Sequence, residues 1–343
     1  MANLAGVSRS AVSLVLNDRA DGFLAKETQL RIQAAAAQLG YTPNHIARSL
    51  RNQRSRVIGL VSNNAVTGPF DGAIIAGANA TAHKAGFMIF ATDTEDYDDN
   101  GAAATKSLLE RSVDGLIRLT VGLHETTVLD SFLTLPAALA NCYPSADSPE
   151  SAASLPAFIP DEVAGGHTAA QHLIGLGHTR IAFLGGEYDS PASSLREQGF
   201  RQAMREANLA VHEPWVLEAG FGIAEGYRSA MRVLDAPAAA RPTAVLAAND
   251  RAAVGITLAA ARLRLQVPAD LSIVGYDDES LIADATVPSL TTMALPFVEM
   301  GSRAMEAVLA RIEPGAAPAE PPSGKVLLPC RLVVRESTAP AAG

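Results

Sequence analysis

Cysteine and long apolar runs are scarce in this chain of 343 residues, and each scarcity excludes a class of protein. The two cysteines, Cys142 and Cys330, stand in no CxxC or other metal-ligand spacing, so we expect buried free thiols and neither a disulfide framework nor a metal site. No run approaches the roughly 18–20 apolar residues that span a bilayer, and the first residues lack the pattern of a secretory signal. We therefore expect a cytoplasmic protein with no membrane partner.

Signatures of catalysis are missing as well. The sequence has no P-loop or GxGxxG run, no HExxH and no GxSxG, and Gly185-Gly186 alone is too little for a dinucleotide site. The seven histidines show no metal-ligand spacing. His178, in the turn LGHTRI, is more simply interpreted as capping a helix end. We expect no enzyme and no cofactor.

Charge is divided unevenly along the chain. The net charge of −9 on its own disfavours a nucleic-acid partner. Residues 1–56, however, hold eight basic and three acidic residues, a formal charge of +5, whereas the remainder carries −14. Positive charge gathered in one short segment is typical of a module that contacts phosphates. We expect a small DNA-binding module joined to a large acidic one.

Residues 8–40 show the spacing of two short amphipathic helices. Ser8 is placed to cap a helix over residues 9–17, and Gly40 to end a second helix over residues 26–39. Apolar residues recur at helical spacing and would form the buried stripes: Ala11, Val12, Val15 and Leu16 in the first helix, and Ile32, Ala35, Ala36 and Leu39 in the second. The pattern fits a helix-turn-helix and, on spacing alone, equally a plain three-helix packing unit.

A proline-led break precedes a short basic segment. Pro43 disfavours the α conformation at Thr42, and Asn44 is placed to cap a helix over residues 45–52. A helix of under three turns is marginal in water, so we expect it to order only against a partner chain and DNA. The alternative is a basic linker that makes no DNA contact.

From Val57 onward, short apolar runs alternate with helical patterns, which predicts parallel α/β sheets. Two such sheets side by side account for the length. The expected strands cover residues 57–61, 88–91, 115–118, 137–140, 157–159, 181–184, 244–247 and 273–276.

Polar residues recur just beyond several of these strands: Asp93, Asn141, Asp161, Asn249-Asp250 and Asp277-Asp278. Ligands of open α/β sheets bind beyond the carboxyl ends of the strands, so the set predicts one polar ligand cleft. For any single aspartate, a helix cap is the simpler interpretation.

The chain resembles the lactose-repressor/galactose-repressor family of bacterial transcription regulators. The runs that carry the resemblance are GVSRSAVSLVLN (6–17), ETQLRIQAAAAQLGYTPNHIARSLR (27–51), PDEVAGG, LGHTRIAFLGG, TAVLAANDRAAVG, VPADLSIVGYDD and PSLTTMALPFVEMG. The resemblance implies an α/β fold, a two-lobed periplasmic-binding-protein-like sensor with parallel sheets, preceded by a small all-α helix-turn-helix headpiece.

For DNA recognition, the resemblance makes residues 6–17 the turn and the recognition helix. Arg9, Ser10 and Leu14 match positions that contact bases, Ser13 would contact phosphate, and Asn17 lies on the same side of the helix. Many relatives carry arginine in place of Leu14, so a bidentate guanine contact is lost there. Leu14 would instead touch a thymine methyl, or it simply extends the helix packing.

Residues 45–52 match the family's hinge helix, which pairs across a dimer. Ala47 matches the contact between the two hinge helices, and Leu50 matches the leucine that enters the minor groove and kinks the duplex. Arg51 would lie near a phosphate.

The resemblance also implies effector contacts. Arg196, Asn249 and Asp277 match the family's principal contacts, and Phe221 matches an aromatic residue that stacks on the ligand. A carboxylate, a guanidinium and an amide pair with sugar hydroxyls as acceptors and donors, while an aromatic face covers C–H patches. From the N-terminal lobe, Phe70 and Asn141 would complete the pocket, and from the strand ends Asp161 joins the set. Leu295 stands where some relatives use glutamine, so the identity of the effector stays open.

Two departures from the family bear on the headpiece. Relatives begin with an additional segment that forms most of the first helix, whereas this sequence starts near the end of that helix at Met1. Ala25 stands where relatives usually place a serine or threonine cap, a loss of about 1 kcal/mol. Both weaken the expected DNA binding.

The resemblance implies three crossings of the chain between the lobes. The expected domains are a headpiece at 1–43 with a truncated first helix, a hinge at 44–56, an N-lobe at 57–155 plus 289–318, a C-lobe at 156–288 plus 319–338, and a disordered tail at 339–343. We expect a DNA-binding regulator, a repressor, that forms a homodimer and whose affinity for operator DNA is controlled allosterically by a sugar or sugar derivative. The alternative is a sensor-only or solute-binding protein of the same fold without effective DNA binding.

Overall fold

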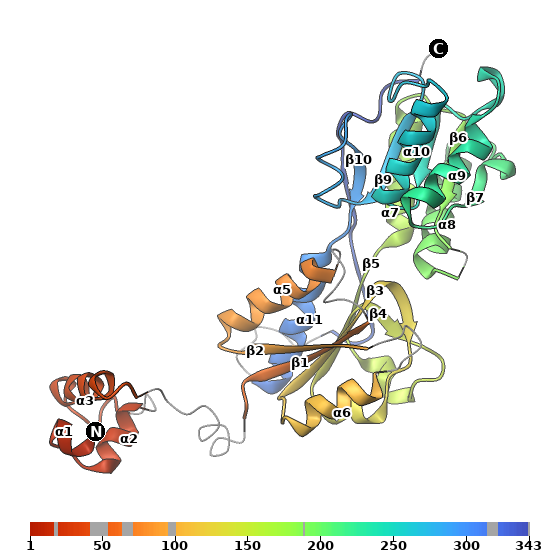
Figure 1. Ribbon diagram of the computed structural model, residues 1–343. Coiled ribbons are helices and arrows are strands. Elements are labelled where there is room, and N and C mark those ends of the chain that lie inside the picture. Colours follow the sequence, from red (N-terminus) through yellow and green to blue (C-terminus); the bar gives the residue numbers. More distant parts are fainter. Residues whose placement is uncertain are drawn as a thin grey trace. The chain divides into compact units, whose positions relative to one another are not determined.

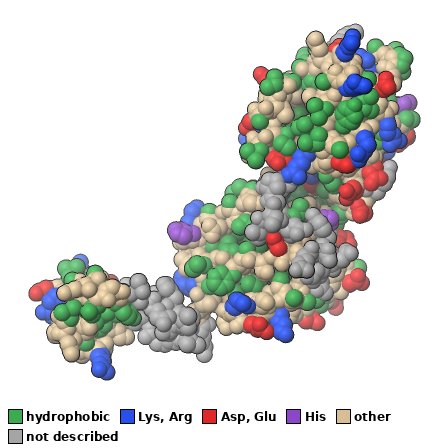
Figure 2. Space-filling view, viewed as in Figure 1, with side chains coloured by type: hydrophobic (Ala, Val, Ile, Leu, Met, Phe, Trp, Pro, Cys, Tyr) green, Lys and Arg blue, Asp and Glu red, His purple; other side chains and the backbone are tan. Residues whose placement is uncertain are grey.

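A computed structural model describes residues 1–16, 20–41, 54–63, 71–94, 101–187, 189–313 and 322–341. The chain divides into two compact units, Met1–Arg56 and Val57–Gly343 (Figure 1). Charged side chains of both signs are spread over the visible face of the larger unit (Figure 2). Within the described ranges, no helix is both long and apolar enough to cross a membrane.

Among its described residues, the smaller unit contains three short helices: α1 (Ala2–Ala5), α2 (Arg9–Leu16) and α3 (Lys26–Gln38). Gly6 adopts a left-handed φ of 65°, which allows the chain to turn between α1 and α2. The Oγ of Ser8 accepts a hydrogen bond from the backbone N–H of Ala11 at 3.1 Å, so the predicted cap is confirmed. Ala25 provides no side-chain cap for α3, as expected.

A small apolar core holds the three helices together. Its fully buried centre is Ile32, which packs with Ala5, Val15, Ala20 and Ala35. The prediction that Leu39 belongs to the buried stripe is wrong, because Leu39 is 54% exposed. The helix ends at Gln38, so the side chain of Leu39 no longer follows the stripe.

The larger unit contains two six-stranded sheets with helices on both faces, which confirms the predicted α/β class (Figure 1). All eight predicted strands are present. The N-lobe sheet has the order β11-β5-β4-β3-β1-β2, formed by Lys325–Leu328, Ala157–Pro160, Ala137–Pro144, Gly115–Thr126, Val57–Asn63 and Met88–Thr94. The C-lobe sheet has the order β12-β10-β9-β8-β6-β7, formed by Arg331–Val333, Thr291–Ala294, Ser272–Asp277, Ala244–Ala247, Ile181–Gly185 and Val216–Glu218.

The inner strands of each sheet are buried between helices because they are apolar on both faces, whereas the edge strands β2, β7, β11 and β12 are partly exposed. In the N-lobe, α5 (Asp71–Lys84) and α11 (Phe297–Ile312) cover one face, and α6 (Ala102–Glu110) covers the other. In the C-lobe, α7 (Glu162–Gly175) and α8 (Pro191–Glu206) cover one face, and α9 (Ile223–Leu234) and α10 (Asp250–Arg262) cover the other. Short 3₁₀ turns occupy Asp130–Thr134, Glu150–Ser154, Glu213–Trp215 and Ala238–Ala240.

The chain crosses between the lobes three times, and each crossing lies later than the expected boundary. β5 pairs with β4 and β11, so residues 157–160 belong to the N-lobe sheet and the first crossing comes at Asp161. β10 pairs with β9 in the C-lobe, which moves the second crossing to residues 295–296. The third crossing, at residues 329–330, follows β11. The expected boundaries at 156, 289 and 319 are therefore wrong, because a strand stays with its sheet until its hydrogen-bonded register ends.

Residues 339–341, near the C-terminus, lie across the C-lobe as a strap, and the side chain of His178 contacts this strap. His178 is 3% exposed, its Nε2 lies 3.0 Å from the carbonyl oxygen of Ala339, and its Nδ1 lies 2.9 Å from the Oγ1 of Thr243. The backbone N–H of Ala341 donates to the carbonyl of Leu176 at 2.8 Å. The expected disordered tail is thus wrong for residues 339–341. His178 binds this strap as well as lying at a helix end.

Substituting His178 with glutamine tests this strap. Burial lowers the pKa of His178 from 6.5, so the folded chain binds fewer protons than the unfolded chain below about pH 6.5. The free energy of unfolding therefore falls as the pH drops through that window. We expect His178→Gln to lose about 1–3 kcal/mol at pH 7.5 and to show a weaker decline toward pH 5. Urea unfolding at a series of pH values measures both.

The matched control is His83→Gln, because His83 is exposed on α5. We expect this variant to follow the wild-type stability at every pH. Equal stability of His178→Gln and wild type at pH 7.5 would contradict the role of His178 in holding the C-terminal strap.

Candidate functional site

Charged and polar side chains gather at the carboxyl ends of the C-lobe strands and at the first crossing. Asp161 and Glu162 follow β5, Asn249 and Asp250 follow β8, and Asp277 ends β9. Parallel strands bring their carboxyl ends to one edge of the sheet, which is why residues so distant in the sequence meet.

Arg196, on α8, is the centre of this cluster. Its guanidinium donates from Nε and Nη2 to the two carboxylate oxygens of Glu162, at 2.9 and 2.8 Å, and from Nη1 to the carbonyl oxygen of Ala248 at 2.6 Å. The guanidinium carbon lies 3.7 Å from the centre of the Tyr276 ring, a cation–π contact. Arg196 and Glu162 are 5% and 2% exposed. The pair is therefore a buried, bidentate salt bridge.

Asp277 faces the same guanidinium at a longer distance. Its Oδ1 lies 3.8 Å from Nη2 of Arg196. Burial raises the pKa of Asp277 well above its usual range, and the nearby Arg196 opposes this rise without cancelling it. Asp277 adopts a φ of 108° and Asp278 one of 59°, so two consecutive residues with side chains lie in the left-handed region.

Asp250 stabilises the turn at Asp277 and Asp278 by binding the backbone of the next residue, Glu279. It is fully buried, and its two carboxylate oxygens accept hydrogen bonds from the backbone N–H of Glu279 at 2.7 Å and from the Oγ1 of Thr292 at 2.6 Å. Burial raises the pKa of Asp250 to about 7, and the two hydrogen bonds limit the rise. Asp250 thereby joins the start of α10 to the turn after β9 and to β10.

Arg335, in the C-terminal segment, holds the outer side of the turn. Its guanidinium donates to Oδ1 of Asp278 at 2.8 Å and to the carbonyl oxygen of Leu290 at 3.0 Å, and it pairs with Asp284 at 2.7 Å. The strained turn is therefore fixed by a buried carboxyl on one side and by a cation on the other.

Two of the predicted contacts also act as helix caps. Oδ1 of Asp161 accepts from the N–H of Ala164 at 3.0 Å at the start of α7, and Oδ1 of Asn249 accepts from the N–H of Ala252 at 2.8 Å at the start of α10. Asp161 and Asn249 therefore do cap helices, which is the simpler of the two interpretations given for such residues. Among the described residues, no hydrogen bond to the second carboxylate oxygen of Asp161 is found.

The structure brings Arg196, Asp277 and the segment before Asn249 together, but it does not join all the other predicted contacts to them. Phe221 packs its ring on Gly186, just after β6, where any larger residue would collide with it. Asn141, at the end part of β4, donates from Nδ2 to the carbonyl of Thr120 at 3.1 Å within the N-lobe. Phe70 lies outside the described residues.

An open groove of about 940 Å³ runs beside Asp277 and Asp278 and along the start of α11. Residues on both sides of the second crossing line it: Ala73, Ala294, Leu295, Pro296, Phe297, Val298, Glu299, Ser302, Arg303 and Glu306. Of the predicted effector contacts, Asp277 lines this groove, whereas Asn141, Asp161, Arg196, Phe221 and Asn249 are not among its lining residues.

Sequence patterns did not predict the salt bridge of Glu162 with Arg196 or the hydrogen bonds by which Asp250 stabilises the turn after β9. Glu162 is next to Asp161 in the predicted strand-end set, and its partner Arg196 is 34 residues away. An acidic residue in the first turn of a helix is ordinary, so the pattern carried no signal for a buried pair.

The predicted DNA contacts are partly described. Arg9, Ser10 and Ser13 lie on the exposed side of α2, while Leu14 is half-buried and packs against the headpiece core. Asn17 and the hinge residues Ala47, Leu50 and Arg51 lie outside the described residues.

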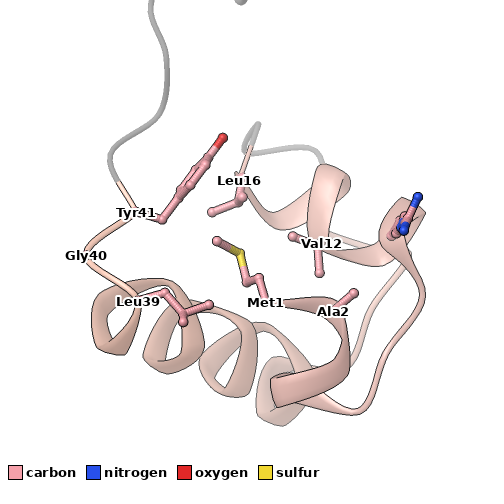
Figure 3. Close-up of a pocket in the computed structure, with 8 residues that line it drawn as sticks. Met1, Ala2, Val12, Leu16, Leu39, Gly40 and Tyr41 are labelled. Atoms are coloured by element: carbon pink, nitrogen blue, oxygen red, sulfur yellow. The ribbon is translucent and has the colours of Figure 1, made fainter.

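A second groove, of about 640 Å³, lies in the headpiece. Figure 3 shows the side chains of Met1, Leu16, Leu39 and Tyr41 pointing toward one another across it. Leu39 therefore faces this groove and not the core.

The buried pair predicts a large asymmetry between single and double substitutions. Glu162→Leu alone leaves the Arg196 guanidinium buried without its counter-charge, and we expect it to lower the free energy of unfolding by about 3–5 kcal/mol. Combining it with Arg196→Met removes both charges, so the double variant should be more stable than Glu162→Leu. Urea unfolding followed by circular dichroism measures both.

The matched control is Glu213→Leu. Glu213 is 67% exposed and forms a bidentate pair with Arg201 at 2.7 Å, which should contribute little to stability because water and salt screen an exposed ion pair. A loss in Glu162→Leu no larger than in this control would contradict the energetic importance of the buried pair.

Asp250→Asn tests the buried carboxyl. With a folded-state pKa of about 7 against the ordinary 3.8, the folded chain binds more protons than the unfolded chain between these values. The free energy of unfolding contributed by Asp250 therefore falls as the pH rises from about 4 to 7. We expect Asp250→Asn to remove roughly 1–4 kcal/mol of that decline, measured by urea unfolding across this range. The exposed Asp235→Asn variant should keep the wild-type slope, and an unchanged slope in Asp250→Asn would refute the shift.

Comparison with known proteins places both units in one family. Residues 1–44 match the model described as bacterial regulatory proteins, lacI family, and residues 170–338 match the periplasmic binding protein-like domain. The ribose operon repressor of Escherichia coli (strain K12) is 32% identical over 315 residues, which are 91% of this chain and 92% of the repressor.

Solved structures show the same likeness. The Lac repressor dimer bound to operator and the anti-inducer ONPF has a TM-score of 0.77 at 27% identity, covering 98% of this chain and 97% of that chain. A LacI-family transcriptional regulator from Enterococcus faecium with bound ribose has a TM-score of 0.65 at 26% identity, covering 83% of this chain and 100% of that chain. The chain belongs to the lacI family of bacterial regulatory proteins.

Proposed function

We propose that this chain is a transcriptional repressor whose affinity for operator DNA is set by a small sugar-like effector bound between the two lobes. One observation carries the proposal: the likeness to the ribose operon repressor covers the headpiece and the two-lobed unit together. A solute-binding protein would share only the two-lobed unit. As a regulator that meets chromosomal DNA, the chain acts in the cytoplasm and catalyses no reaction.

The headpiece reads DNA with the exposed side of α2. Arg9 and Ser10 contact base edges, Ser13 contacts phosphate, and Asn17 extends the same surface. Leu14 has part of its side chain in the headpiece core, so the exposed part meets a thymine methyl and adds little energy of its own. The +5 charge of residues 1–56 supports phosphate contacts.

The hinge couples the two units. Ala47 packs against its counterpart in a second copy of the chain, Leu50 enters the minor groove at the centre of the operator, and Arg51 lies near phosphate. Two copies place two recognition helices on the half-sites of a near-palindrome.

The effector binds at the strand ends of the C-lobe and closes the lobes on itself. Asp277, Arg196, Asn249 and Asp161 supply polar contacts, and Phe221 supplies an aromatic face. Asn141 and Phe70 reach the ligand from the N-lobe. The ribose in the Enterococcus faecium relative supports a sugar as the ligand.

If closure shifts the two N-lobes of a dimer relative to each other, the hinge helices lose their pairing and DNA is released. The alternative is an effector that favours DNA binding. A coupling free energy of about 1–3 kcal/mol would change operator affinity by roughly 5–150-fold.

Fluorescence anisotropy with a labelled duplex from the chain's own promoter tests the proposal. We expect salt-sensitive, sequence-specific binding by the full chain, and a loss of about tenfold or more in Arg9→Ala. The matched control, Arg232→Ala, removes the same charge from an exposed site on α9 and should bind as wild type does. Equal affinity for the promoter duplex and for a scrambled duplex would overturn the function.

A further inference from the structure

The side chain of Asp277 is not oriented by its charged neighbour. Its Oδ1 lies 3.8 Å from Nη2 of Arg196, which is beyond hydrogen-bonding distance. Among the described residues, no side-chain hydrogen bond to the Asp277 carboxyl group is found. The direction of this side chain therefore follows from its backbone, whose φ of 108° is unfavourable for any residue except glycine. Such a conformation persists only where neighbouring contacts impose it.

The next residue, Asp278, connects this backbone to the C-terminal segment, residues 335–341. Asp278 also has a left-handed φ, of 59°. Its Oδ1 accepts a hydrogen bond from Nη2 of Arg335 at 2.8 Å, and no other side-chain partner of Asp278 is found within the described ranges. Of the described side chains, Arg335 is thus the one that fixes Asp278 in this conformation.

Arg335 is itself held in a single orientation. Its Nη1 donates to the carbonyl oxygen of Leu290 at 3.0 Å, and its Nε lies 2.7 Å from Oδ1 of Asp284. Its backbone N–H donates to Oγ1 of Thr291 at 2.9 Å. The three nitrogens of the planar guanidinium serve three different acceptors, so the group cannot rotate without losing contacts. Arg335 therefore joins the start of β10 rigidly to the turn after β9.

The residues that follow Arg335 are bound between the starts of β9 and β10. The Oγ of Ser337 donates to the carbonyl oxygen of Ile273 at 2.6 Å and accepts from the N–H of Thr291 at 2.8 Å. The N–H of Ile273 donates to the carbonyl oxygen of Ser337 at 2.9 Å. Ser337 is 2% exposed. This buried pairing fixes the backbone from which the side chain of Arg335 extends to the turn.

A different pair of contacts fixes the residue after the turn. The backbone N–H of Glu279 donates to Oδ2 of Asp250 at 2.7 Å, and the carboxylate of Glu279 lies 3.1 Å from Nε of Arg251. These contacts act on Glu279 and not on the side chain of Asp278. The Glu279 N–H is protected from solvent exchange only while the turn stays closed on Asp250, so its exchange rate reports on the turn.

We propose that Arg335 is a positioning residue of the candidate effector site: by binding Asp278, it keeps the turn in the conformation in which Asp277 lines the groove. Arg335 is not among the lining residues of that groove and need not touch a ligand. The C-terminal segment thereby becomes part of the site, although Arg335 lies 57 residues from Asp278 in the sequence. The inference rests on the proposed function in one respect, because Asp277 is a proposed effector contact.

Hydrogen–deuterium exchange of the full chain, measured at single amides, tests this role. In Arg335→Gln we expect the N–H of Glu279 to exchange about tenfold faster than in wild type, because the turn opens without its anchor. The amides of the buried strand β8 should change far less. A merely structural role would raise the rates at both places by the same factor. A rise at Glu279 no larger than that in β8 overturns the inference.

The matched control is Asp284→Asn. Asp284 is the other acidic partner of Arg335, but it is 67% exposed and lies outside the strained turn. We expect this variant to exchange at Glu279 as wild type does. A rise in Asp284→Asn as large as that in Arg335→Gln contradicts the assignment to the Asp278 contact.

A mutant cycle with Asp278→Gly tests whether Arg335 acts through Asp278. Glycine adopts a left-handed φ without strain, so the turn no longer needs the anchor. In this background Arg335→Gln should change exchange at Glu279 by less than about twofold. An effect no smaller than in the wild-type background overturns the inference. If Arg335→Gln does not fold, Asp278→Asn breaks the same contact from the other side and must raise exchange at Glu279 more than in β8.

The exchange measurement uses neither effector nor DNA, so it is independent of the anisotropy test of the repressor function. If exchange at Glu279 does not respond to Arg335→Gln while the chain distinguishes its promoter from a scrambled duplex, this inference falls and the repressor function stands. If the two duplexes bind equally and exchange responds as expected, the repressor function falls and Arg335 keeps its role in the turn.

Discussion

A charged guanidinium with almost no water around it must be solvated by the protein, and much of the C-lobe is arranged around this need of Arg196. Glu162 provides the counter-charge, Ala248 a carbonyl oxygen, and Tyr276 an aromatic face. These partners come from α7, the end of β8 and β9, so one side chain joins three elements to α8. The backbones of α7 and α8 must also approach each other closely. Gly166 allows this, because any Cβ there would collide with the backbone of Arg196.

The same pair lies next to a connection between the lobes. Glu162 is the first residue of α7 and follows the crossing at Asp161, whose N–H donates to the carbonyl of Leu328 in the N-lobe strand β11. The anchor of the C-lobe cluster is therefore one residue away from a hydrogen bond to the other lobe. The Arg196 cluster and the N-lobe are therefore joined through two consecutive residues, Glu162 and Asp161, without a long chain of intermediate contacts.

Sequence patterns predicted the elements well because their signals are local. The eight apolar runs and the Ser8 cap depend on neighbouring residues, and all are present. The strands β7, β10, β11 and β12 were missed because each has only three or four residues and mixes polar with apolar side chains. The crossing points were misplaced because sheet membership depends on long-range pairing, such as that of β5 with β11.

The candidate site was predictable only in part, for the same reason. The position of polar residues after strands identified Asp161, Asn249 and Asp277, since parallel strands end at one edge. The pairing of Glu162 with Arg196 spans 34 residues and leaves no periodic trace in the sequence. Whether an arginine is available to a ligand depends on its partners, and only the folded chain shows them.

The strained turn at Asp277 and Asp278 gives the cleft a second link to the N-lobe. Left-handed residues other than glycine cost of order 1–3 kcal/mol each and persist only where the surroundings hold them, here Asp250 and Arg335. Asp250 also accepts a hydrogen bond from Thr292, on the strand that leads through the second crossing into α11. Asp277, one of the predicted effector contacts, therefore lies in a turn that is held by contacts reaching that crossing. The Arg196–Glu162 pair and the turn at Asp277 and Asp278 thus lie beside two different connections between the lobes.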